Sequence, residues 1–83
     1  MTKIEAAIQR MEDLKEDEKV PSNVKDRLDE CIDTLQDDDE DLSVRVNTAA
    51  SVLDEVSNDP NIEQHTRTEI WNIASMVESL DNE

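Results

Sequence analysis

The fold is decided by residues 42–80, which read LSVRVNTAASVLDEVSNDPNIEQHTRTEIWNIASMVESL. Apolar residues recur in this stretch at steps of three and four, both before and after the turn signal Asn-Asp-Pro-Asn at residues 58–61. That spacing places the apolar residues on one face of a helix, whereas Pro beside Asn and Asp interrupts helices. The stretch therefore predicts a helical hairpin.

The same pattern occurs in the first half of the chain, which indicates an internal repeat. Thr2 followed by Glu5 predicts a capping box at the start of a first helix, and Pro21 suits the first turn of a second helix. Adding 42 to a position in the first half reaches a residue of similar character. The pairs include Ile4 with Val46, Met11 with Leu53, Leu28 with Ile70 and Cys31 with Ile73.

The sequence thus predicts an all-α protein, a four-helix bundle with up-and-down connections that is built from two helical hairpins with a quasi-repeat. We expect a single domain over residues 1–83, with hairpin one at 2–36, an acidic linker at 37–41 and hairpin two at 42–80. A repeat of about 42 residues is also typical of HEAT-like helix pairs. An open arrangement of two hairpins is therefore the alternative.

Composition narrows the classes of function. The chain has 83 residues, of which 23 are Asp or Glu and 8 are Lys or Arg, for a net charge of −15. This balance argues against binding of nucleic acid or of an anionic membrane through a broad basic surface. No apolar run approaches the roughly 18 residues of a membrane-spanning helix, and no signal peptide is expected.

Two further expectations concern the environment. Cys31 is the single cysteine, so it has no partner for an internal disulfide, and a reducing cytoplasm is the expected location. An excess of acids with little Lys resembles proteins adapted to molar salt, where self-repulsion is screened. Acids on ordinary solvated helix faces are the alternative explanation.

The sequence predicts no catalytic, metal-binding or cofactor-binding residues. Asp37, Asp39 and Asp41 imitate the opening of a calcium loop, but Leu42 stands where the turn glycine belongs and Thr48 where the bidentate Glu belongs. One Cys and one His do not suffice for a structural zinc site, and a chain without glycine has no glycine-rich phosphate loop. We therefore expect a protein that is not an enzyme.

The candidate partner-binding residues gather mostly around the second turn. They are Arg45, Asn58, Asp59, His65, Arg67 and Trp71. Arg67 and Trp71 lie one helical turn apart, and Trp and Arg are enriched at binding hot spots. The alternative is that Trp71 widens the core while Arg67 pairs with Glu63. Arg45 joins the same surface if the bundle brings its helix alongside.

Several segments of the chain carry a family resemblance. They are residues 42–46 (LSVRV) with Ala49, 53–61 (LDEVSNDPN), 65–68 (HTRT), 70–72 (IWN) and, more weakly, Val20-Pro21 with Asn23. In these residues the chain resembles uncharacterised protein family 0147, a family of small archaeal proteins. The resemblance implies an archaeal cytoplasmic protein with a four-helix, up-and-down bundle of the bromodomain-like class. It implies no activity, cofactor or catalytic residue, and Glu63 departs from the Pro expected at that position.

Three functions remain open at this point. The first is a small non-enzymatic protein–protein interaction module or adaptor, in an archaeal cytoplasm, with an unknown protein partner. The second is a self-associating structural bundle, that is, a homo-oligomer. The third is an acidic mimic of nucleic acid that occupies a basic protein surface.

Overall fold

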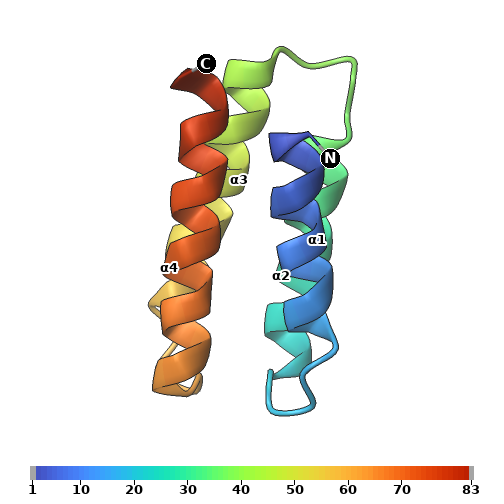
Figure 1. Cartoon of the computed structure of the whole chain (residues 1–83). Helices are drawn as coiled ribbons and strands as arrows, with labels where there is room; N and C mark the ends of the chain where they lie inside the picture. The colour runs from blue at the N-terminus through green and yellow to red at the C-terminus, as the bar shows by residue number, and fades with distance from the viewer. Residues whose placement is uncertain (1, 83) are drawn as a thin grey trace.

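Four helices run along one long axis, and the chain reverses direction at each linker (Figure 1). The computed structural model describes residues 2–82, with side chains for residues 2–81. The helices are α1 (Lys3–Lys15), α2 (Ser22–Leu35), α3 (Leu42–Ser57) and α4 (Gln64–Ser79), followed by the short 3-10 helix η1 (Leu80–Asn82). The predicted all-α, up-and-down four-helix bundle is confirmed.

The order of packing closes the bundle. α1 packs against α2 and α4, and α3 packs against the same two helices. Contact between α1 and α4 joins the first hairpin to the second along their length. The open, HEAT-like alternative is therefore wrong.

The core is built from the apolar stripes that the sequence predicts. Each helix contributes fully buried side chains, among them Met11, Leu28, Leu53 and Ile73, all 0% exposed. Cys31 is also 0% exposed, and its Sγ lies 3.7 Å from the carbonyl oxygen of Ala49 on α3. Burial of this cysteine in the stripe of α2 was expected from its spacing.

The first helix begins at the predicted capping box. The backbone N–H of Glu5 donates to Thr2 Oγ1 at 3.2 Å, and the backbone N–H of Thr2 donates to Glu5 Oε1 at 3.0 Å. The latter hydrogen bond lowers the pKa of Glu5. Pro21 is the N-cap of α2, one position before the helical turn in which the sequence placed it.

The three linkers share one conformation, although their sequences differ. They span residues 16–21, 36–41 and 58–63, and the second residue of each is an aspartate. Its Oδ1 accepts a hydrogen bond from the backbone N–H two residues later, at 2.9 Å for Asp17, 3.1 Å for Asp37 and 2.8 Å for Asp59. No residue that the structure describes has a positive φ. Aspartate side chains, rather than glycine, thus shape these turns.

The fifth residue distinguishes the second linker from the other two. Val20 and Ile62, in the first and third linkers, are buried in the core at the same end of the bundle (Figure 1). Glu40, in the second linker, is exposed at the opposite end. Apolar linker residues therefore cover one end of the core, and the second linker places a charged residue at the equivalent position.

Candidate partner-binding surface

Arg67 forms hydrogen bonds with main-chain carbonyls where α3 ends. Its Nε donates to the carbonyl oxygen of Ser57 at 2.8 Å, and its Nη2 donates to that of Asp59 at 2.9 Å. A third hydrogen bond runs from Nη1 to Gln64 Oε1 at 3.3 Å. The guanidinium therefore donates to carbonyls at and just beyond the end of α3, where no intrahelical partner is available. The ion pair with Glu63, which was the alternative from sequence, is replaced by these hydrogen bonds.

Asn58 and Asp59 also belong to the fold at this end of the bundle. Asn58 is the exposed C-cap residue of α3. Asp59 uses both carboxylate oxygens, since Oδ1 accepts from the N–H of Asn61 and Oδ2 accepts from Asn23 Nδ2 at 3.1 Å. The second contact ties the third linker to the start of α2.

His65 connects the third linker to the first. Its Nε2 lies 3.6 Å from Asp17 Oδ2, and its Nδ1 lies 3.2 Å from Glu63 Oε2. The pKa of Asp17 is lowered mainly by the hydrogen bond from the backbone N–H of Lys19, with a smaller contribution from His65. The predicted residues around the second turn therefore do come together, but most of them hold linkers in place.

Arg45 does not join this group, so its expected place beside Arg67 is wrong. Its Nη1 donates to the carbonyl oxygen of Leu35 at 2.9 Å and its Nε to that of Glu40 at 3.0 Å. These contacts hold Arg45 at the end of the bundle formed by the second linker. Ser57 follows Arg45 by twelve positions along α3, a helical length of about 18 Å.

Trp71 is the apolar member of the predicted set, and 51% of its surface is exposed. The alternative in which it widens the core is therefore wrong. It lies on the side of α4 that turns toward α3, because Arg67, one turn earlier on that side, reaches Ser57. On the other side of α4, Glu69 pairs with Arg10 of α1 at 2.9 Å.

The side of α4 that carries Trp71 holds charged residues as well as small and polar ones. By helix spacing, Arg67 precedes Trp71 by one turn and Glu78 follows it by two, and on α3 Asp54 lies one turn beyond Ala50. We define the Trp71 face by Asn47 and Ala50 of α3 and by Thr68, Trp71 and Ser75 of α4. These five residues are uncharged, and Asp54, Arg67 and Glu78 flank them.

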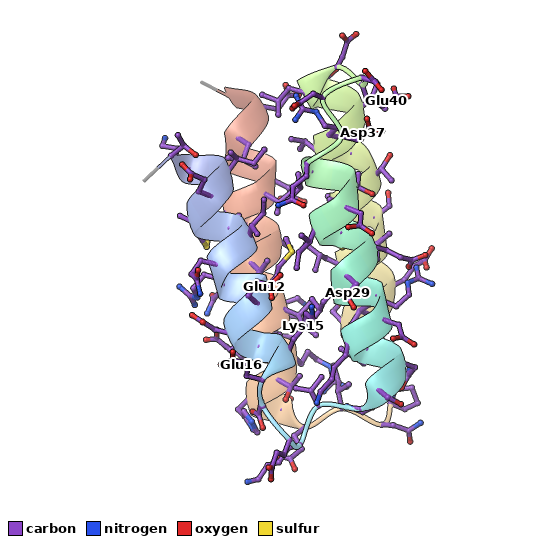
Figure 2. The ribbon with its side chains drawn as sticks, turned by 90° about the vertical axis from the view of Figure 1, so that its right-hand side faces the viewer. Glu12, Lys15, Glu16, Asp29, Asp37 and Glu40 are labelled. Atoms are coloured by element: carbon purple, nitrogen blue, oxygen red, sulfur yellow. The ribbon has the colours of Figure 1, made fainter. Side chains whose placement is uncertain are left out.

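The surface of α1 and α2 is different in character (Figure 2). Lys15 lies between two acids, with its Nζ 3.7 Å from Glu12 Oε2 and in contact with Asp29 Oδ1. Asp29 is the main cause of the raised pKa of Lys15. Glu16 and further acids continue along these helices (Figure 2). This side of the first hairpin is therefore densely charged (Figure 2).

Sequence reasoning missed a shorter repeat of helix plus linker. In each linker an aspartate precedes a basic residue of the next helix by eight positions, as in Asp37 with Arg45 and Asp59 with Arg67. Asp17 with Lys25 completes the series. The aspartate and basic residue eight positions apart can be seen in the sequence. The offset of 42 covers two such units at once, so comparison at that offset did not reveal the shorter repeat.

Other classes of site find little support in the described residues. Within residues 2–82, no group of three or more His, Cys, Asp or Glu side chains is arranged to hold a metal ion. No helix in the same range has the length and apolar character needed to cross a membrane. The Asp37 side chain, which imitates a calcium-loop position, instead accepts a hydrogen bond within its own linker.

Comparison with known proteins confirms the family resemblance and extends it to the first half of the chain. The family model described as Uncharacterised protein family (UPF0147) matches residues 1–80. The UPF0147 protein of Methanosarcina mazei is 38% identical over 77 residues, which cover 93% of this chain and 83% of the relative. That of Sulfurisphaera tokodaii is 38% identical over 78 residues, covering 94% and 88%. The crystal structure of a UPF0147 protein from Thermoplasma acidophilum has a TM-score of 0.89 at 33% identity and covers 94% of this chain and 92% of that chain.

Proposed function

The chain belongs to the uncharacterised protein family UPF0147, and from that premise we propose that it is a non-enzymatic interaction module that binds a protein partner through the Trp71 face. The observation that carries the proposal is the 51% exposure of Trp71. Trp is the residue type most often found as a binding hot spot, and covering its ring removes a large apolar area from water.

The surroundings of Trp71 support the same proposal. The centres of protein interfaces are depleted in charged residues, and the five residues of the Trp71 face are uncharged. Asp54, Arg67 and Glu78 flank this face by helix spacing, and a partner that covers it meets these charges at the edge of the contact. The acids of α1 and α2 lie outside the contact and favour solubility of the complex.

We propose that the protein is not an enzyme because the polar candidate residues already form hydrogen bonds within the fold. Arg67 and Asp59 use their hydrogen-bonding groups on main-chain atoms and on the side chains of Gln64 and Asn23. Side chains that hold linkers together are poorly placed to act on a substrate. A cytoplasmic location is part of the proposal as well, and the free thiol of Cys31 supports it.

Self-association through the same face is the second candidate. A second copy offers an identical Trp ring, but it also brings a net charge of −15, which repels the first copy at low salt. An acidic mimic of nucleic acid is a third candidate, and it places the contact on the acids of linker two. Binding by such a mimic would weaken steeply as salt increases, whereas binding that buries the Trp71 ring would depend little on salt.

The test compares Trp71→Ala with Val44→Ala. Val44 is a matched control because it is also an exposed apolar residue, 46% exposed, and it lines a shallow groove with Thr34 of α2, away from α4. Tagged wild type and both variants are used to capture partners from archaeal cytoplasm at its native salt. The captured protein is then purified, and its affinity is measured directly.

We expect wild type and Val44→Ala to bind alike and Trp71→Ala to bind at least tenfold more weakly. The emission of Trp71, the single tryptophan, should shift to shorter wavelength when an otherwise Trp-free partner fragment covers it. Equal binding by all three proteins would refute the Trp71 face. Sedimentation that shows concentration-dependent dimers in wild type but not in Trp71→Ala would establish self-association instead.

A further inference from the structure

An apolar pocket lies at the end of the bundle where the second linker crosses. Its volume is about 680 Å³, within the range of protein ligand sites. The apolar part of its lining comes from α1, α2, α3 and η1. These residues are Ile4, Ile8, Leu35, Leu42 and Leu80.

The pocket has a specific cause in the linkers. At the opposite end of the bundle, Val20 and Ile62 occupy the fifth position of their linkers and are 3% and 6% exposed. Glu40 holds the same position in the second linker, and its side chain points away from the core (Figure 2). The second linker therefore places no apolar side chain over this end of the core, and Leu42 beside the opening is left 37% exposed.

The charge around the opening selects a class of occupant. Linker two carries five consecutive acids, residues 37–41, all exposed, and Glu5 and Asp38 line the pocket itself. Lys3 also lines it, and Arg45 is engaged with the carbonyls of Leu35 and Glu40. Within the lining, Lys3 and Arg45 balance Glu5 and Asp38, and the acidic excess comes from the other acids of residues 37–41 in the linker beside the opening. An apolar group is therefore attracted when it arrives on a basic segment and repelled when it arrives on an acidic one.

We propose that this end pocket binds a short basic amphipathic segment of a partner protein, which inserts one or two large apolar side chains while its Lys or Arg residues meet the acids of residues 37–41. This is the helix-in-groove mode of recognition, with apolar anchors one turn apart. A second copy of the chain fits poorly, because it would bring net charge −15 to the acids of this linker. The proposal is independent of the Trp71 face.

Glu40→Ile provides a test that separates pocket filling from damage to the fold. By analogy with Val20 and Ile62, the new side chain should turn inward, fill the pocket and raise the melting temperature. Glu40→Gln removes the same charge without filling the pocket and is the matched control. The probe is a fluorescein-labelled peptide of sequence LKKLLKLLKKLLKL, and the comparison peptide has Glu at every Lys.

We expect wild type, Glu40→Gln and Trp71→Ala to bind the basic peptide with affinities within about threefold of one another. Glu40→Ile should bind it at least tenfold more weakly, and the acidic peptide should bind none of them. On binding, methyl resonances of Ile4, Ile8 and Leu42 should shift in NMR spectra. Leu42→Ser, which trims the partly exposed lip of the pocket, should weaken binding several-fold even if Glu40→Ile does not fold.

Three results would overturn the proposal. The first is equal binding by Glu40→Ile and wild type, which would indicate attraction to surface acids alone. The second is failure of wild type to bind the basic peptide, or equal binding of the acidic one. The third is a wild-type dimer that becomes monomeric in Glu40→Ile, which would identify a second copy as the occupant.

Discussion

Arg45 and Arg67 occupy the same place in successive helices, and each guanidinium donates a hydrogen bond to the last carbonyl of the helix before. The distances are 2.9 Å from Arg45 Nη1 to Leu35 O and 2.8 Å from Arg67 Nε to Ser57 O. The final carbonyls of a helix lack intrahelical partners and carry the negative end of its dipole. A cation from the following helix satisfies both needs and fixes the angle between the two helices.

Replacement of Arg67 by Ala should destabilise the bundle by about 1–3 kcal/mol, because the charged donor to two main-chain carbonyls is lost. Urea unfolding followed by circular dichroism measures the change. Arg10→Ala is the control, since its ion pair with Glu69 is 40% or more exposed on both side chains and should contribute less than about 1 kcal/mol. Equal losses in the two variants would contradict the capping role.

Thr66 offers a change that should stabilise the protein. It is 1% exposed within the apolar stripe of α4, and its Oγ1 has no hydrogen-bond partner. Thr66→Val keeps the shape and removes the buried hydroxyl, so we expect a gain of about 1 kcal/mol in the free energy of unfolding. Thr68→Val is the control, because that hydroxyl is exposed and donates to Gln64 O at 3.1 Å. No gain over this control would show that the Thr66 hydroxyl is satisfied in solution.

Cys31 should make stability fall at alkaline pH. Burial raises the pKa of its thiol from 9.0 to about 12. Above pH 9 the unfolded thiol loses its proton while the folded one keeps it, so the unfolded state is favoured increasingly up to pH 12. Relative to Cys31→Ala, the free energy of unfolding should fall by up to about 1.4 kcal/mol per pH unit in that window.

The measurement for Cys31 is urea unfolding of wild type and Cys31→Ala between pH 8 and pH 10.5, where the difference between the two isolates the thiol. Alkylation by iodoacetamide at pH 8 gives an independent check and should be slow until urea unfolds the chain. A difference that stays constant with pH, together with rapid alkylation, would mean that the thiol is accessible.

Salt should stabilise the bundle if its acidity is an adaptation to a salty cytoplasm. A net charge of −15 repels itself in the compact state, and the Debye length falls from about 10 Å at 0.1 M salt to about 3 Å at 1 M. We expect the melting temperature to rise with KCl over that range. The rise should be smaller in the Asp38→Asn/Asp39→Asn variant, and a flat or falling profile would rule out this adaptation.

The fold was largely predictable because its determinants are local. Helix-spaced apolar residues such as Met11 and Leu53 define buried faces, and Thr2 with Glu5 defines a helix start. These signals come from residues that are three or four positions apart along the chain. The offset of 42 added the pairing of hairpins, but only the packing of α1 on α4 decided between a closed bundle and an open one.

The candidate surface was less predictable because it depends on where chain segments meet. Trp71 is adjacent to the stripe residue Ile70, and sequence spacing alone leaves a ring at that angle either buried or exposed. The partners of Arg67 are carbonyls whose positions follow from the path of linker three. The separation of Arg45 from Arg67 was accessible from helix length and chain reversal, and the expectation that they adjoin overlooked it.

The absence of positive φ among the described residues has a consequence for how this chain tolerates mutation. Many helical proteins turn their corners on a glycine that no other residue type replaces without strain. Here no described corner residue needs glycine, although Pro is excluded where a backbone N–H is donated, as at Lys19, Asp39 and Asn61. The side-chain requirements fall on one aspartate per corner and, at the second and third corners, on the following arginine. Substitutions should therefore be poorly tolerated at Asp17, Asp37 and Asp59, while neighbouring corner positions should tolerate many side chains.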